Sequence, residues 1–403
     1  MNIFSSATSY LGVDIGTSSI KLVELENYKN QARLKTYGYA DVSINILSSA
    51  IEKDNQAIAD YINQIASRAH TQTRQVVAAL PTFSVFNFII NLPAMPKKDL
   101  DAAIKWEAKK FIPVPLEEMI LDWKILGNKK NINKPAPNHV PVTDNKKSES
   151  APKSASAGDD MLKTLKDSTK AFANQEKVDK EQFDYNKNPS KSDNNYRILL
   201  TAAPKNLVAR YIDIFKRAKF NLLSLETEAF ALSRSLLGND LSTVMVVDIG
   251  ATNADICVIE EGVPVLNRGL DTGGDFITKT IMNSLNVNKD RAEQFKRDFG
   301  LSTTGDRNVP EVIQKSLNSI INEIKFVFKL YQRQGSNTID KIILTGGSAF
   351  LPNLPKYLSD LLNMQVIIGD PWDRIIYPMD IKPILQEIGP RMSVSVGLAM
   401  RDI

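Results

Sequence analysis

Val13–Leu25 reads VDIGTSSIKLVEL, and Val247–Ile259 reads VDIGATNADICVI. In both stretches a short apolar run leads into Asp-Ile-Gly, and a second apolar run follows. This pattern predicts two strands joined by a tight turn. The second stretch repeats the strand lengths and the polar residues at the turn as well as the Asp-Ile-Gly itself. The chain is therefore expected to contain two similar halves.

Both turns carry groups that can bind a polyphosphate. Gly16 and Gly250 permit positive φ and close backbone approach, so N–H groups and hydroxyls at the tips can face an anion. The carboxylate before each turn can hold the water ligands of a metal ion. An ordinary Asp-Gly hairpin turn would explain one copy, but it gives no reason for the hydroxyls to repeat. The tip residues concerned are Asp14, Thr17 and Ser18 in the first copy and Asp248 and Thr252 in the second.

Composition excludes several classes of function. At 403 residues and 43% hydrophobic, the chain can bury the cores of two domains. No apolar stretch reaches transmembrane length and the N-terminus lacks a signal peptide, so a cytoplasmic location is expected. Cys257 is interpreted as a core residue. His70 and His139 are too few for a metal cluster or a Ser-His-Asp site. The net charge of +4 lies mostly in 127–195, with 13 Lys against 10 Asp or Glu, so no nucleic-acid partner is expected.

The order of predicted elements indicates an α/β chain with insertions. Three strands, a helix over 55–69 and a strand over 74–80 precede a small subdomain, whose core is predicted to hold Trp106 and Trp123, with partner contact as the alternative. Residues 127–195 are interpreted as disordered, with a weak amphipathic helix at 161–172. The expected domains are 1–80 (first half), 81–126 (inserted subdomain), 127–195 (disordered insert), 196–240 (first half continued), 241–370 (second half) and 371–403 (C-terminal helices returning to the first half).

Two further patterns bear on a nucleotide. Glu293 and Lys296 lie on one face of a predicted helix, where they form either a surface ion pair or a pair of groups that reaches a ribose. Gly346 and Gly347 end a buried strand, where paired glycines let a flat ring lie against the backbone. Glu228 begins a helix and is a candidate for orienting an attacking water, although its carboxylate would also favour a helix N-terminus.

These motifs resemble the actin-like ATPase superfamily and, within it, the PilM family of type IV pilus assembly proteins, with FtsA second. LGVDIGTSSIKLVEL, LDWKIL, TEAFAL, TGGSAFLPNL and SVSVGLAMR carry the likeness. The resemblance implies two ribonuclease H-like half-domains around a nucleotide cleft, with a small inserted subdomain. It implies ATP or ADP and Mg²⁺ as cofactors, with Thr17, Ser18, Lys21 and Thr252 at the phosphates, Asp14 and Asp248 at Mg²⁺, Asp255 supporting the second loop, Glu293 and Lys296 at the ribose, and Gly346, Gly347 and Ser348 at the adenosine.

The likeness to PilM also implies a function. The expected protein is a cytoplasmic scaffold, peripheral to the inner membrane, that grips the N-terminal cytoplasmic peptide of a PilN-like membrane protein between its first half and its small subdomain. Pilus motor components are further candidate partners, and ATP hydrolysis is expected to be slow. No direct membrane insertion is expected, because an FtsA-like amphipathic helix does not follow the GLAMR segment. The alternatives are an FtsA-like filament-forming ATPase, a small-molecule kinase of the same fold, and a binding module that has lost nucleotide use.

Overall fold

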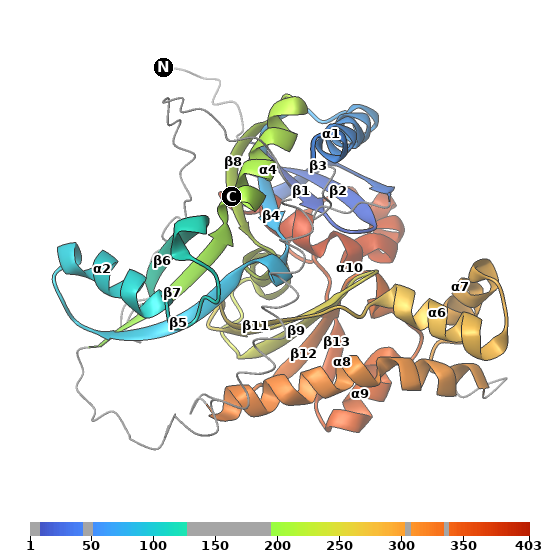
Figure 1. Cartoon of the computed structure of the whole chain (residues 1–403). Coiled ribbons are helices and arrows are strands. Elements are labelled where there is room, and N and C mark those ends of the chain that lie inside the picture. Colours follow the sequence, from blue (N-terminus) through green and yellow to red (C-terminus); the bar gives the residue numbers. More distant parts are fainter. Residues whose placement is uncertain (1–8, 43–50, 127–194, 303–307, 334–337) are drawn as a thin grey trace. The chain divides into compact units, whose positions relative to one another are not determined.

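The computed structural model describes residues 9–42, 51–126, 195–302, 308–333 and 338–403 (Figure 1). The chain forms two compact units. The first unit comprises Met1–Ile44, Tyr61–Phe83 and Lys219–Ile403, and the second comprises Asn45–Asp60 and Ser84–Ala218. The disorder predicted for 127–195 falls outside the described residues, apart from Asn195. The helix predicted at 161–172 falls outside them entirely.

The first sheet of the first unit has six strands in the order β14-β3-β2-β1-β4-β8. β1, β2 and β3 form an antiparallel meander, and β4 and β8 continue the sheet parallel to β1. All residues of β1 from Leu11 to Ile15 are buried, as expected of a strand covered on both faces. The strands are β1 (Ser9–Ile15), β2 (Ser19–Tyr28), β3 (Gln31–Asp41), β4 (Gln75–Leu80), β8 (Asn221–Thr227) and β14 (Ile375–Ile376).

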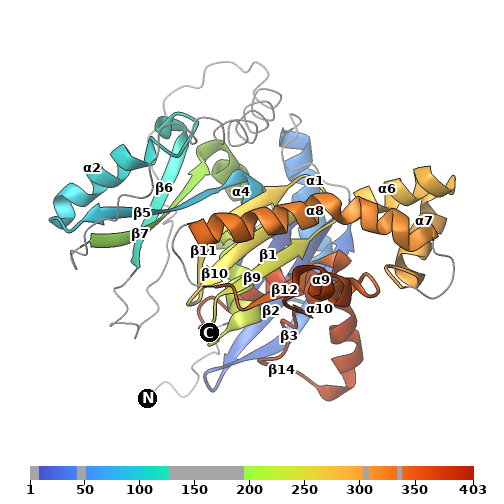
Figure 2. The same ribbon diagram turned by 90° about the horizontal axis from the view of Figure 1, so that it is seen from below.

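The second sheet repeats this topology with the order β11-β10-β9-β12-β13. β9, β10 and β11 are again an antiparallel meander, with β12 and β13 parallel to β9 (Figure 2). The hairpin registers also correspond, because Asp14 pairs with Lys21 across the first hairpin and Asp248 pairs with Asp255 across the second. The strands are β9 (Val244–Ile249), β10 (Ala254–Glu260), β11 (Val263–Leu270), β12 (Lys341–Thr345) and β13 (Gln365–Ile368).

Helices cover both sheets of the first unit. α10 packs on β1, where a Cβ at Gly12 would overlap the carbonyl oxygen of Ser395. Gly38 in β3 likewise gives room to α1, since its Cβ would lie 2.8 Å from Cγ2 of Ile65. A π-helical turn over Ser233–Leu237 follows α5, where the helix that begins at Glu228 was expected to continue. The helices are α1 (Ile51–Arg68), α5 (Glu228–Leu232), α6 (Gly274–Leu285), α7 (Lys289–Asp298), α8 (Asn308–Arg333), α9 (Leu354–Leu362) and α10 (Lys382–Ala399).

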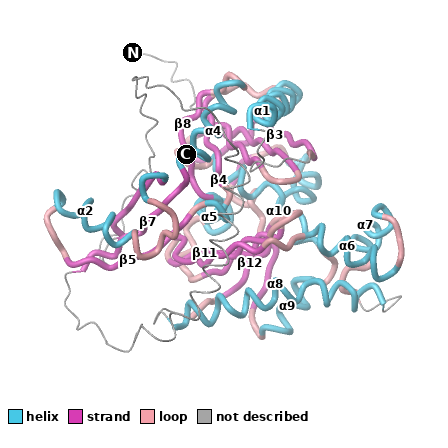
Figure 3. The backbone as a smooth tube through the Cα atoms, in the orientation of Figure 1, coloured by secondary structure: helices cyan, strands magenta, loops and turns pink. Residues whose placement is uncertain are grey.

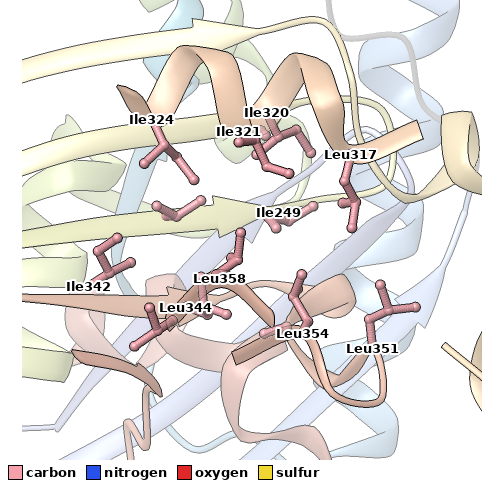
Figure 4. Packing of buried hydrophobic residues seen from close by; sticks show 14 of the residues in the cluster. Ile249, Leu317, Ile320, Ile321, Ile324, Ile342, Leu344, Leu351, Leu354 and Leu358 are labelled. Carbon is pink, nitrogen blue, oxygen red and sulfur yellow. The ribbon is translucent and has the colours of Figure 1, made fainter. Parts of the chain in front are cut away.

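The largest core of the first unit lies around the second sheet (Figure 4). Ile320 and Ile324 from the amphipathic helix α8 pack on the sheet side by side with Ile249 of β9, and Leu354 and Leu358 come from α9. Cys257, predicted as a core residue, is buried in a neighbouring cluster between the sheets. Burial on this scale fixes the second sheet, and with it the β9–β10 hairpin inside that sheet.

The second unit contains a three-stranded antiparallel sheet in the order β5-β7-β6 (Figure 3). The buried residues Leu100 and Ile104 of α2 pack against the sheet. In the same unit the amide of Asn55 donates to Asp213, with 2.9 Å between Nδ2 and Oδ2. The elements are β5 (Phe86–Pro93), β6 (Met119–Leu126), β7 (Asn195–Pro204), α2 (Lys97–Ala108) and α4 (Lys205–Arg217).

The second unit differs from the sequence-based expectation in two ways. The strand from Asn195 pairs with β5 and β6, so it belongs to the small sheet and not to a continued first half. Trp106 is 65% exposed and lies outside the core, because it falls on the helix face away from Ile104. Trp123 packs partly against the core and donates its Nε1–H to Asp101. No helix among the described residues is long and apolar enough to cross a membrane.

Candidate nucleotide site

The two hairpins have the same turn geometry. In the first, the N–H of Gly16 donates to the carbonyl of Ser19 over 3.0 Å, and in the second the N–H of Gly250 donates to Asn253 over 2.9 Å. Neither glycine adopts the positive φ that the sequence suggested. Each position favours a residue without a side chain. A Cβ would lie 3.2 Å from the carbonyl oxygen of Ser19 at Gly16 and 3.1 Å from that of Asn253 at Gly250.

The tips of the hairpins touch each other. The hydroxyl oxygens of Thr17 and Thr252 are 2.7 Å apart, although 235 positions separate the two residues. Ser18, beside them, accepts a hydrogen bond at its carbonyl from the N–H of Val42. The fold therefore brings the predicted phosphate-binding residues of the two hairpins into one place.

Lys21 and Asp14 form a nearly buried ion pair under the first tip. The distance from Nζ to Oδ2 is 2.7 Å, and Asp14 is only 5% exposed. Burial by itself would lower the pKa of Lys21, but the charges of Asp14 and Asp248 outweigh it and raise the pKa. Lys21 therefore stays a cation, placed by its cross-strand partner.

Three further carboxyl groups have raised pKa values. Burial, with the charge of Asp14 adding to it and that of Lys21 opposing it, raises the pKa of Asp248 to about 6. Burial and the nearby Asp14 raise the pKa of Glu228 to about 8. Burial and the charges of Glu228 and Asp248 hold the pKa of Asp255 well above its ordinary value. These three carboxyl groups are therefore harder to ionise than an exposed carboxyl, chiefly because they are buried.

This cluster fits a hydrated cation better than a directly ligated one. Among the described residues no group of three or more His, Cys, Asp or Glu side chains is arranged to hold a metal. Mg²⁺ usually keeps several waters and takes few protein carboxylates. Asp14 and Asp248, which approach from the two hairpins, are suited to bind those waters. Oδ1 of Asp255 is buried without a hydrogen-bond partner, while its Oδ2 accepts from Asn253 over 2.7 Å.

Glu228 is held at the edge of this cluster by Thr82. Its Oε2 accepts from the Thr82 hydroxyl over 2.7 Å and from the Thr82 N–H over 3.2 Å. Glu228 begins α5, so its carboxyl also lies where a helix N-terminus favours negative charge. At neutral pH the raised pKa keeps most of this group protonated, and a protonated carboxyl is a poor base.

The paired glycines pack directly against the second hairpin. Gly346 has a φ of 83°, and a Cβ there would overlap Oδ1 of Asp248 and lie 2.6 Å from the carbonyl oxygen of Ile249. Its N–H donates to the carbonyl of Pro390 in α10 over 3.0 Å. Gly347 follows on the surface of the loop. A glycine is thus required at position 346, because any side chain there would displace the carboxylate of Asp248.

Glu293 and Lys296 bind each other and support the start of α6. Nζ of Lys296 lies 2.9 Å from Oε1 of Glu293, 2.9 Å from the hydroxyl of Thr278 and 3.2 Å from the carbonyl oxygen of Gly274. Glu293 also accepts from Thr278. The pair therefore does more than a surface ion pair would, because it positions Gly274 beside the second hairpin.

Gly273, Gly274 and Arg391 are site residues that the sequence reasoning missed. The N–H of Gly274 donates to the carbonyl of Gly250 over 2.9 Å, and a Cβ on Gly274 would lie 2.6 Å from the hydroxyl of Ser348. A Cβ on Gly273 would lie 2.6 Å from the carbonyl oxygen of Ala251. The signal was a second glycine pair, in DTGGD, between a strand and a helix.

Arg391 reaches the site from α10. Its guanidinium pairs with Asp41 and lies 5.0 Å from the ring centroid of Tyr39. Its Cγ would be 3.8 Å from a Cβ on Gly347, and its charge opposes protonation of Lys21. Arg391 thus places a second cation between the glycine loop and the first hairpin. No sequence pattern singled it out, because Arg391 lies just before the SVSVGLAMR segment of α10 and outside it.

Two sheets of one topology, with paired hairpins that meet at their tips, define an actin-like ATPase fold. The chain belongs to the family described as type IV pilus assembly protein PilM, whose family model matches residues 12–176 and 175–403. The chain is similar to the solved structure of a PilM-PilN type IV pilus biogenesis complex, with 24% identity, a TM-score of 0.71 and coverage of 97% of this chain and 98% of that one. The ethanolamine utilization protein EutJ from Carboxydothermus hydrogenoformans is similar in fold, with 15% identity, a TM-score of 0.52 and coverage of 98% and 89%.

Curated relatives match part of the chain. Cell division protein FtsA of Neisseria meningitidis serogroup B is 26% identical over 185 residues, which are 38% of this chain and 41% of that protein. Cell shape-determining protein MreB of Escherichia coli K12 is 24% identical over 177 residues, 36% of this chain and 51% of that protein. The chain thus spans about half or less of the curated relatives that it matches.

Proposed function

We propose that the chain is a nucleotide-switched scaffold of type IV pilus assembly, which binds Mg-ATP at the paired hairpins. The observation that carries this proposal is the contact between Thr17 and Thr252 above the buried Asp14–Lys21 pair. The hydroxyls of the two tips meet there, with the Lys21 cation and the carboxylates of Asp14 and Asp248 nearby. A triphosphate with Mg²⁺ matches both charges, because its oxygens face the donors and its metal faces the carboxylates.

Each residue of the site has a separate role in this proposal. Thr17, Ser18, Lys21 and Thr252 donate to phosphate oxygens, and Asp14 and Asp248 hold the water ligands of Mg²⁺, which neutralises phosphate charge when it is bound. Asp255 orients the second loop through Asn253. Gly346, Gly347 and Ser348 form the platform for the adenosine. Glu293 and Lys296 keep Gly274 in place and are near enough to that loop to face the ribose.

ATP hydrolysis at this site is expected to be slow. The attacking water needs a group that orients it, and the candidate Glu228 is held by Thr82 in an environment that favours its protonated form. A scaffold needs only that the nucleotide have different affinities for two conformations of the chain. Turnover above about 1 s⁻¹, which is ordinary for a kinase, would contradict this view.

The partner of this chain is proposed to be the N-terminal cytoplasmic peptide of a PilN-like membrane protein. One solved structure similar to the chain is a complex with PilN. In the second unit, β5 forms an edge of the described sheet, and edge strands accept extended peptides. Phe86 and Phe88 of β5 stack with 6.2 Å between ring centroids, and Phe111 lies 5.2 Å from Phe88, which makes an aromatic surface for a peptide side chain.

The nucleotide proposal is tested by titrating Mg-ATP calorimetrically into the wild type and Asp248→Ala, with released phosphate followed in the same samples. We expect binding that is lost in the variant, with almost no phosphate released. Asp360→Ala, which removes an exposed carboxylate from α9, is the matched control and should bind as the wild type does. Absence of binding by a folded wild type would reject the nucleotide site and leave a peptide-binding scaffold.

The partner proposal is tested with a fluorescent peptide of the PilN-like N-terminal tail. Phe88→Ser should weaken its binding at least about tenfold, because the aromatic surface loses its central ring. Leu361→Ser on α9 removes an exposed apolar side chain elsewhere and should have no effect. Equal binding by wild type and folded Phe88→Ser would exclude β5 as the partner site.

A filament is the second candidate function, and the partial similarity to FtsA and MreB is the observation that favours it. Sedimentation with and without Mg-ATP separates the two. Protein that pellets only with nucleotide forms filaments, and protein that stays in the supernatant while binding nucleotide agrees with a scaffold.

A further inference from the structure

The outward face of α2 carries a tryptophan among lysines. Trp106 is 65% exposed, and Lys98, Lys105 and Lys109 are also exposed. At 3.6 residues per turn these four side chains fall within an arc of about 100°. The buried residues of the helix, Leu100, Ile104 and Ala108, lie on the other side against the sheet. This face of α2 is therefore exposed, while the opposite face packs against the sheet.

The charges of this face are not neutralised by their neighbours. Within the described part of the chain, the ammonium groups of Lys98, Lys105 and Lys109 have no ion-pair partner. The acidic groups on the helix are engaged or lie aside. Glu107 pairs with Lys110 over 2.8 Å, and Asp101 accepts from Trp123 over 3.0 Å. Asp99 lies in the first helical turn, where the helix dipole favours it.

We propose that the face formed by Lys98, Lys105, Trp106 and Lys109, here the α2 basic face, binds the surface of an anionic lipid bilayer. Its chemistry matches such a surface in two respects. Lysines attract anionic headgroups while their methylene stems lie against apolar material. Tryptophan places an apolar ring at headgroup depth and keeps its indole N–H in the polar layer.

The ring of Trp106 already contacts one cation. Nζ of Lys110 lies 4.4 Å from the ring centroid, so one side of the indole packs under a cation. An acidic protein surface would satisfy the lysines, whereas a bilayer interface also matches the exposed ring of Trp106 at the edge of the lysine arc. A bilayer interface accounts for both the lysines and the ring.

The expected binding is weak and peripheral. Each lysine near an anionic membrane contributes roughly fivefold to binding, and the effect decreases with salt. Three lysines and one ring adsorb to the surface without inserting the helix. If a partner of the proposed kind tethers the chain to a membrane, the local concentration of lipid makes such weak contacts effective.

The test uses the full chain and vesicles of phosphatidylcholine alone or mixed equally with phosphatidylglycerol. We expect sedimentation with the mixed vesicles at low salt, and a blue shift of tryptophan emission. Of the three tryptophans, Trp372 is buried and Trp123 is partly buried and hydrogen-bonded, so the shift reports Trp106. Trp106→Phe should abolish the shift.

Charge-matched variants decide between a specific face and general attraction. Replacing Lys98, Lys105 and Lys109 together by Glu should weaken vesicle binding by more than about tenfold. Replacing Lys279, Lys289 and Lys315 by Glu changes the net charge equally at exposed positions of the first unit and should leave binding intact.

Three results would overturn the proposal. These are no binding of the wild type to mixed vesicles, equal binding to phosphatidylcholine, and equal losses in the two triple variants. A shift of Trp106 emission on adding polyglutamate but not vesicles would assign the face to an acidic protein instead. None of these results depends on nucleotide or on the PilN-like peptide, so they leave the proposed function untouched.

Discussion

Thr17 and Thr252 donate and accept one hydrogen bond between the tips of two hairpins, with 2.7 Å between their hydroxyl oxygens. A phosphate bound at the tips would replace this neutral hydrogen bond by stronger bonds to charged oxygens. Nucleotide binding and the contact between the tips therefore compete for the same hydroxyls. The balance between the two determines whether loss of a hydroxyl lowers or raises the affinity for Mg-ATP.

Thr252→Val removes both the contact between the tips and one donor to phosphate. The lost charge-assisted bond exceeds the neutral one by about 1 kcal/mol, so Mg-ATP affinity should fall about fivefold. Titration calorimetry measures the change. Thr280→Val, which removes a hydroxyl bonded only to its own helix, should leave affinity unaltered. An affinity gain in Thr252→Val would mean that the hydroxyl serves only to close the tips.

Gly346→Ala should displace Asp248. Gly262 provides a matched control, because it has nearly the same φ, 78° against 83°, and a Cβ there meets nothing within 4 Å. Gly262→Ala therefore reports the backbone cost alone, about 1 kcal/mol. Gly346→Ala adds the clash, a further 1–3 kcal/mol or so, and should weaken Mg-ATP binding more than tenfold. Chemical denaturation and titration measure the two effects, and similar values for both variants would contradict the contact with Asp248.

Stability of the metal-free protein should depend on the protonation of Glu228. Its pKa of about 8 lies above the ordinary 4.5, so its proton favours the folded state below pH 4.5 and the contribution is lost as pH rises towards 8. We expect the melting temperature in a chelating buffer to fall over this window, because the free energy of unfolding decreases by at most about 1.4 kcal/mol per pH unit for this one group. Glu228→Gln keeps the group neutral and should make the profile less steep above pH 5, with the remaining slope due to Asp248 and Asp255. Parallel profiles for the two proteins would refute the assignment.

Arg391 should contribute to nucleotide affinity through its charge. Its pair with Asp41 is partly exposed, so the guanidinium can turn to a phosphate at little cost. Arg391→Gln should weaken Mg-ATP binding about fivefold, with the difference shrinking at high salt. Arg297→Gln, exposed on α7, is the control for net charge. Asp41→Asn should leave affinity equal or higher, and a loss as large as that of Arg391→Gln would show a purely structural role for the pair.

The sequence predicted the repeated hairpins because strand periodicity and turn residues are local properties. The strand predicted over 74–80 agrees with β4 (Gln75–Leu80), and the equal order of the two sheets follows from the repeat. The positions of the paired carboxylates and of Gly346 could be predicted because each lies where a strand ends.

Features that depend on tertiary contact were not predictable. Arg391 and Pro390 reach the site because α10 packs on β1, a relationship between segments almost 400 positions apart. The role of Glu293 and Lys296 was left open, because spacing along a helix cannot show that Lys296 also contacts Thr278 and Gly274. Trp106 was assigned to the core from residue type, while its angular position on α2 exposes it. Of the two properties that glycine offers at position 16, positive φ and close approach, the structure uses only close approach.

The cross-strand registers pair Asp14 with Lys21 in one hairpin and Asp248 with Asp255 in the other. The backbone is thus close to a two-fold repeat, while its charges are not. A symmetric pair of hairpins would accept an elongated anion equally well in either direction. Here one hairpin supplies a cation and the other a second carboxylate, so the triphosphate and metal ion proposed above would have only one favourable direction. Lys21 of the first hairpin corresponds to Asp255 of the second, and this one difference in charge is enough to distinguish the two ends of such a ligand.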